Sequence, residues 1–149
     1  MTSPYEMFKT KKLTSPDTPA ILEYGDFEIY VKYGGAGNRS FINAFQMKMR
    51  QFERRTRLAE QGSLSDEAVT LLEKQKAKAM AELYADQIVV GWKGVKDENG
   101  KDLKYSRDAV IKLLTDLEAL FGDIVDQCSK EESFKKEIEA AEEKNSLKS

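Results

Sequence analysis

The sequence predicts a mainly α-helical (α+β) protein, with a helical body of about four helices, an N-terminal strand and a β-hairpin around residues 88–105. Over most of the chain, apolar residues recur every three or four positions, which is the period of helices with one buried face. Two short runs instead favour strands: residues 27–33, which end in a glycine-rich loop, and residues 88–105, which turn back at residues 97–100. With 149 residues, 40% of them hydrophobic and 34% charged, the chain has the size of one domain.

The chain divides into three parts by composition. Residues 1–20 hold all three prolines among scattered polar residues, so we expect a flexible N-terminal arm. Residues 21–144 form the single folded domain, and residues 145–149 a frayed C-terminus. No apolar run follows the N-terminal lysines or approaches the length of a membrane span, so neither a signal peptide nor an anchor is expected. One cysteine, Cys128, excludes an internal disulfide and is typical of a reducing compartment.

The first predicted element is a half-buried strand over residues 27–33, where Phe27, Ile29 and Val31 alternate with polar neighbours. A glycine-rich loop at residues 34–37 ends it. The spacing of the next apolar residues predicts a helix that Asn38 or Ser40 caps and that runs to about residue 60.

A second helix follows a short polar link. Gly62 breaks the first pattern, Ser65 is a good N-cap, and the acidic Asp66 and Glu67 lie in the first turn, where the helix dipole favours them. This helix is expected to run to about Gln87 and to pack antiparallel to the first.

The stretch IVVGWKGVKDENGKDLKYSRD, residues 88–108, predicts the β-hairpin. Ile88, Val89 and Val90 favour a strand, and residues 97–100 favour a turn. Leu103 would lie on the return strand, paired with the first. Trp92 between two glycines is interpreted as a packing anchor, in preference to a platform for a ligand. The structural residues of this hairpin are Trp92, Gly94, Asn99, Gly100, Tyr105 and Ser106.

Two further helices complete the predicted body. Ser106 caps a third helix, whose leucine-rich stripe continues at helical spacing to Cys128. A last helix over about residues 130–143 is mostly acidic and has a thin apolar stripe that contains Phe134 and Ile138. So narrow a face is too small to dock strongly on a private core, so this helix is either a loosely held edge or a surface for another chain.

No catalytic, metal or cofactor site is predicted. The chain has no histidine, which removes the commonest general base and metal ligand. Cys128 lies on an apolar stripe and is interpreted as a buried structural thiol. The glycine cluster after residue 33 lacks the spacing of a phosphate loop, and Asp97, Glu98 and Asp102 lack the spacing of a calcium loop. We therefore expect a non-enzymatic interaction protein.

Two surfaces are candidates for partner binding. The first is the Phe134 and Ile138 face, which would bind a client or a second copy of the chain. The second is the arginine-rich helix with Arg50, Arg54 and Arg57, which would steer acidic partners. The net charge is −2, so binding to nucleic acid or to an anionic membrane is not expected.

The chain resembles the tail assembly chaperones of phages with long, non-contractile tails. The resemblance rests on residues 38–45, residues 62–67, Phe134 and the pair Lys144-Asn145, and most specifically on residues 88–117. Glu118 stands where relatives often have proline, so no sharp helix break is expected there.

This resemblance implies an assembly factor that works in the cytoplasm of the infected host and is absent from the mature virion. Such chaperones bind the tape-measure protein, keep it soluble and promote polymerisation of the tail tube around it. They often come from a frameshifting gene, whose longer product recruits the tail tube protein. Residues 143–145 are compatible with a slippery sequence, so this chain would be the shorter product. Self-association is expected, because several copies on one client gain from multivalency.

Two other functions stay open at this point. A structural tail completion or connector subunit would be found in purified virions, unlike a chaperone. A small nucleic-acid-binding regulator would use the arginine-rich helix and would bind with steep salt dependence.

Overall fold

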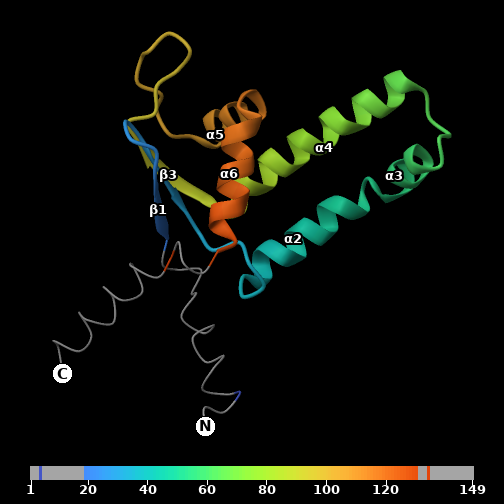
Figure 1. The fold of residues 1–149 in the computed structure, drawn as a ribbon, viewed down its shortest axis with the longest axis horizontal. Helices are drawn as coiled ribbons and strands as arrows, with labels where there is room; N and C mark the ends of the chain where they lie inside the picture. The colour runs from blue at the N-terminus through green and yellow to red at the C-terminus, as the bar shows by residue number, and fades with distance from the viewer. Residues whose placement is uncertain (1–3, 5–18, 131–133, 135–149) are drawn as a thin grey trace.

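A computed structural model describes Pro4, residues 19–130 and Phe134. Within these residues, five helices accompany a three-stranded antiparallel sheet of order β1-β2-β3 (Figure 1). The predicted mainly α, α+β class is confirmed. In chain order the elements are β1 (Ala20–Glu23), β2 (Glu28–Val31), α2 (Arg39–Arg50), α3 (Glu53–Glu60), α4 (Asp66–Gln87), β3 (Val89–Lys93), α5 (Arg107–Asp116) and α6 (Glu118–Cys128).

The sheet has one buried and one open face. Ile29 and Val31 of β2 are buried, as the alternation predicted, and the intervening Tyr30 is only half-buried. Strand β1 was not predicted, and it places Ala20, the last residue of the expected N-terminal arm, in the sheet with no exposed surface. A turn at residues 24–27, with Gly25 at a φ of 85°, joins β1 to β2.

The glycine-rich loop after β2 is a structural turn. Its cap is Asn38, which accepts a hydrogen bond from the backbone N–H of Phe41 and donates one to the carbonyl of Tyr33. The N–H of Gly34 donates to the carbonyl of Cys128, and a Cβ at Gly34 would lie 2.9 Å from the Cys128 Sγ. The loop is therefore closed against α6 by contacts within the fold.

The predicted helix over residues 38–60 is two helices, so the expectation of one continuous rod is wrong. At Gln51 and Phe52 the backbone N–H groups bond to carbonyls three residues back, a tighter turn than the α-helix, and α3 begins at Glu53. Phe52 is thereby buried against α4 with Leu72 and Ala79. Helices α2 and α3 run antiparallel to α4 and extend well beyond the sheet (Figure 1). We call residues 46–79 the helical extension.

The turn of the predicted hairpin is confirmed, but its two arms pair only over residues 95–103 and form no extended return strand. Strand β3 itself pairs antiparallel with β2, a long-range partner. Beyond it, the chain folds back through the bridge between Lys96 and Asp102 and through two backbone hydrogen bonds, from the Asp97 N–H to the carbonyl of Lys101 and from the Leu103 N–H to the carbonyl of Val95. The reason for the short pairing lies at Gly94, which has a φ of 77° and whose added Cβ would be 2.6 Å from the carbonyl oxygen of Asp26. The chain turns out of the sheet there and continues as a loop to residue 106.

A helix break at Leu117 corrects the expectation that no sharp break occurs at Glu118. Leu117 has φ −116° and ψ 80°, so α5 ends and α6 begins on either side of it without a proline at position 118. Helix α5 packs on α4, while α6 contacts α4 through the ring pair of Phe121 and Tyr84 and also packs on β1, so the break turns α6 toward the sheet (Figure 1). The predicted caps Ser65 and Ser106 both accept a backbone N–H bond at their helix starts.

One main core joins the sheet to the helices. Its fully buried side chains come from every layer, and they include Ile29, Val31, Leu83, Ile88, Val110, Leu114, Ile124, Cys128 and Phe134. We call the elements that share this core the body: the sheet, α5, α6 and the ends of α2 and α4 that pack on them. No helix in the described part of the chain combines the length and the apolar character needed to cross a membrane.

Candidate interaction surfaces

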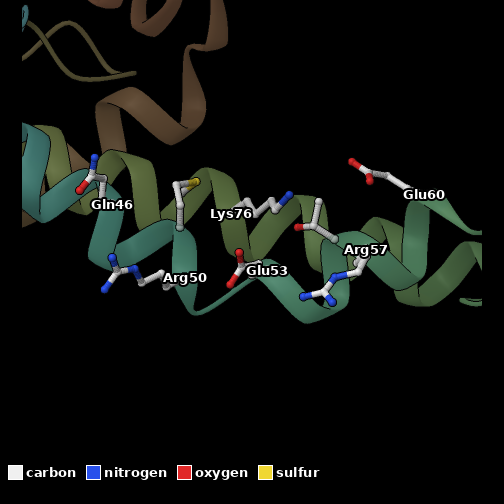
Figure 2. A pocket seen from close by; sticks show the side chains of 8 residues that line it. Gln46, Arg50, Glu53, Arg57, Glu60 and Lys76 are labelled. Atoms are coloured by element: carbon white, nitrogen blue, oxygen red, sulfur yellow. The ribbon is translucent and has the colours of Figure 1, made fainter.

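The helical extension carries a groove of about 550 Å³ between α2–α3 and α4 (Figure 2). Most of its lining comes from one side of α2 and α3, and Lys76 reaches it from α4. The lining consists of Gln46, Met49, Arg50, Glu53, Thr56, Arg57, Glu60 and Lys76. We call this surface the extension groove. Three basic and two acidic side chains line it, so its charge is mixed.

The structure brings two of the three predicted arginines together. Arg50 and Arg57 line the extension groove, whereas Arg54, exposed on the same helix as Arg57, does not line it. None of the three side chains makes a salt bridge or hydrogen bond with another described residue. By contrast, the neighbouring Lys48 pairs with Glu82 at 3.1 Å, and Arg55 donates to Gln75 while its guanidinium lies over the Phe52 ring.

Phe134 lies elsewhere than the partner-binding prediction requires. Its ring is 1% exposed and packs edge-on against Tyr33, with the ring centroids 5.5 Å apart. In this conformation it belongs to the core of the body. Ile138, the second residue of the predicted face, lies outside the described residues, as does most of the predicted helix over residues 130–143.

A second hollow, of about 510 Å³, lies between the loop after β3 and helix α5. Leu103 of the loop and Leu113 of α5 line it together with Leu117 at the helix break, whose side chain is 48% exposed. The charged and polar members of its lining are Lys96, Asp97, Glu98, Asn99, Lys112 and Asp116. We call this surface the loop cavity.

Lys112 holds the loop against the helix beside this cavity. Its Nζ donates to Glu98 Oε1 at 2.8 Å and to Asp116 Oδ2 at 2.6 Å, and these hydrogen bonds raise the pKa of Lys112. Within the loop, the Asp97 carboxylate accepts the backbone N–H groups of Asn99 and Lys101. The loop is thus an ordered wall of the cavity.

The predicted hairpin residues have structural roles. Trp92 is half-buried; its indole N–H donates to the carbonyl of Leu103 at 2.9 Å, and its ring meets Tyr105 edge-on. The Tyr105 hydroxyl donates to the carbonyl of Val89. Gly100 has a φ of 78°, so Asn99 and Gly100 form the predicted turn. These contacts fix the loop that walls the loop cavity.

Cys128 is fully buried, and burial raises its thiol pKa to about 11. A protonated, inaccessible thiol is a poor nucleophile. Among the described residues, no group of three or more Cys, Asp or Glu side chains is placed to hold a metal ion. In the described part of the chain, the extension groove and the loop cavity can therefore contact a partner through apolar and charged side chains.

The fold and these two surfaces define a small helix-rich protein in which α2 and α3 pack against α4 as an extended helical arm. The chain belongs to the YdaY prophage protein family, whose model matches residues 36–145, well over half of the chain. The protein is therefore phage-derived. No curated protein and no solved structure matches it significantly.

The loop cavity was not predicted, because the apolar spacing between residue 106 and Cys128 suggests a single buried stripe on which Leu113 and Leu117 would both lie. The break after Asp116 exposes Leu117, and no local residue type signals it. The extension groove had a visible signal, since Gln46, Glu53 and Glu60 repeat every seven residues on the same side as the arginines.

Proposed function

We propose that this protein is a non-enzymatic tail assembly chaperone, which binds the tape-measure protein of its phage, keeps it soluble and promotes polymerisation of the tail tube around it. Membership of a prophage protein family supports a phage role. The resemblance of residues 88–117 to tail assembly chaperones supports this particular one. Burial of the lone cysteine and the lack of histidine favour binding over catalysis.

The observation that carries the proposal is the location of the loop cavity. All of its lining residues lie between positions 96 and 117, within the stretch in which the resemblance is most specific. Tape-measure proteins are long and helical, and an amphipathic helix binds by inserting apolar side chains into such a hollow. Enclosing one leucine-sized side chain stabilises a complex by about 1.5–3 kcal/mol. Several weak contacts along one client would add through multivalency.

Co-expression with the tape-measure protein of the same prophage tests the proposal. We expect the tape-measure protein to move from the insoluble to the soluble fraction and to co-purify with the chaperone. Leu117→Asp should abolish co-purification, because it places a charge in the apolar part of the loop cavity. Leu117 is the N-cap residue of α6 and Asp is a preferred N-cap, so the variant should remain folded.

Val125→Asp is the matched control, since Val125 is an exposed apolar residue of α6 that does not line the cavity. It should bind the client as the unmodified chain does. A tape-measure protein that is equally insoluble with and without this chain contradicts the chaperone role. Equal capture by the Leu117 and Val125 variants contradicts the loop cavity as the binding site but keeps the role.

Mass spectrometry of purified virions separates this proposal from a structural tail subunit. A chaperone of the infected cytoplasm is expected to be missing from virions, and a completion or connector subunit would be present in stoichiometric amount.

The gene sequence tests the frameshift separately. Codons GAA-AAA-AAC for residues 143–145 contain the slip site, and the longer product would recruit the tail tube protein; GAG or AAG at either of the first two codons removes that slip site.

A further inference from the structure

One side of the helical extension carries charges of alternating sign at regular spacing. Arg50, Glu53, Arg57 and Glu60 line the extension groove and follow each other at intervals of three or four residues (Figure 2). Residues three or four positions apart lie on the same face of a helix, so all four charges can face one neighbouring helix. Read along the chain, their signs are positive, negative, positive and negative.

These four charges have no oppositely charged or hydrogen-bonding partner within the described residues. All four side chains are exposed, and none makes a salt bridge or a hydrogen bond with another described residue. On the same helices Lys48 pairs with Glu82 of α4, whereas Arg54 is also unpaired among the described residues but does not line the groove. The four charges differ from Arg54 in lying together along the groove, where they are available for a contact outside the described residues.

We propose that the extension groove binds the same groove of a second copy of this chain, with the two α3 helices antiparallel about a two-fold axis near position 55. Positions 50 and 60, and likewise 53 and 57, lie symmetrically about position 55. In this arrangement Arg50 faces Glu60 of the second copy, and Glu53 faces Arg57 of the second copy. The two-fold axis repeats both contacts, which gives four pairs of opposite charge.

The charge pattern selects this occupant over others. A parallel pairing in register would set each arginine against the same arginine and each glutamate against the same glutamate. An acidic partner or a nucleic acid would gain little, because Glu53 and Glu60 nearly offset Arg50, Arg57 and Lys76 in the groove. Read backwards, the same four charges have the opposite sign at each position. A second copy that runs antiparallel therefore places a negative charge opposite each positive one.

The two Glu53–Arg57 pairs, which lie nearest the two-fold axis, do not depend on the bend between α2 and α3. Glu53 and Arg57 both belong to α3, about 6 Å apart along its axis. Arg50 belongs to α2, beyond the tight turn at Gln51 and Phe52, so the outer pairs also depend on that bend. Exposed ion pairs are individually weak, so a salt-sensitive dimer is expected, whose charges fix register and orientation.

Sedimentation velocity on the full chain tests the pairing, over a concentration series at low and at high salt. Glu53→Arg and Arg57→Glu each replace two attractive contacts of the dimer by two repulsive ones. Each single variant should therefore dimerise about tenfold or more weakly than the unmodified chain. An equimolar mixture of the two variants should recover association, because the arginine introduced at position 53 of one variant then faces the glutamate introduced at position 57 of the other. The double variant E53R/R57E should recover it as well.

Arg54→Glu is the matched control, since it makes the same charge change on the same helix at a residue that does not line the groove. It should leave the dimerisation constant within about twofold. Circular dichroism verifies that every variant is folded, and Lys76→Glu gives a second variant in the groove on another helix.

Recovery of association in the mixture, without an effect of Arg54→Glu, establishes the pairing. A monomeric unmodified chain at several hundred micromolar and low salt would overturn it. So would oligomers that ignore both single variants, or single variants that dissociate but do not recover on mixing. Tape-measure capture plays no part in this test, so its outcome is independent of the proposed function.

Discussion

The body and the helical extension are stabilised to different degrees. In the body, side chains from the sheet, α4, α5 and α6 are buried together in one continuous core that also includes Phe134. In the extension, only Phe52, Leu72 and Ala79 are buried, with Met49, Ala59 and Leu64 packed around them. The exposed Met47 and Leu71 belong to the extension as well.

Most of the stability comes from the body, and the extension contributes exposed charged surface. The body supplies most of the buried apolar surface, so it sets the free energy of unfolding. The extension buries little apolar surface and presents charges without partners among the described residues, so a contact made there with another chain would disturb little of the folded core. It is the region that we expect to open first and to gain stability from a partner.

The largest expected effect is the loss of the body's aromatic anchor. Phe134→Ala should lower the free energy of unfolding by about 3–5 kcal/mol, because the ring is fully buried and packs against Tyr33. Chemical denaturation of the full chain measures it, and Met47→Ala, at a residue 67% exposed, is the control, with a change of at most about 0.5 kcal/mol. If Phe134→Ala left the free energy of unfolding unchanged but weakened self-association, Phe134 would belong to a partner-binding face, as the sequence suggested.

A smaller and local effect is expected in the extension. Phe52→Ala removes the largest buried side chain of its small core, at a cost of about 3 kcal/mol to the packing of α3 on α4. Hydrogen exchange should then show faster exchange in residues 46–79 and unchanged exchange in β2 and α6, because the two cores are separate. Equal acceleration in both regions would mean that the extension and the body unfold as one unit.

The sequence predicted the parts of the fold that local chemistry determines. The alternation in β2, the caps Ser65 and Ser106, and the turn at Gly100 all depend on residues within a few positions of each other. The second helix was placed correctly because a cap, acidic first-turn residues and an apolar stripe all agree.

The missed features depend on contacts between distant residues. Strand β3 pairs with β2 in preference to the loop that follows it, and this choice is made by the shared core of the sheet. The break at Leu117 turns α6 toward the sheet, where it packs on β1. Of the partner-binding candidates, Arg50 and Arg57 do line a common groove, while Phe134 was assigned to an open face because its partner Tyr33 is about 100 residues away.

The smallest expected effect concerns Trp92, at the junction between the body and the loop cavity. Trp92→Phe keeps a ring beside Tyr105 and removes the N–H that bonds to the carbonyl of Leu103, so the free energy of unfolding should fall by about 1 kcal/mol. Trp92→Ala should cost about 2–3 kcal/mol, below the figure for a fully buried tryptophan, because the ring is half-buried. Urea denaturation measures both variants, and Tyr105→Phe, which loses one hydrogen bond to Val89, is the matched comparison. A loss of about 3 kcal/mol or more in Trp92→Phe would mean that this one hydrogen bond holds the loop as a whole, and client capture should then weaken with it, because Leu103 would leave the cavity wall.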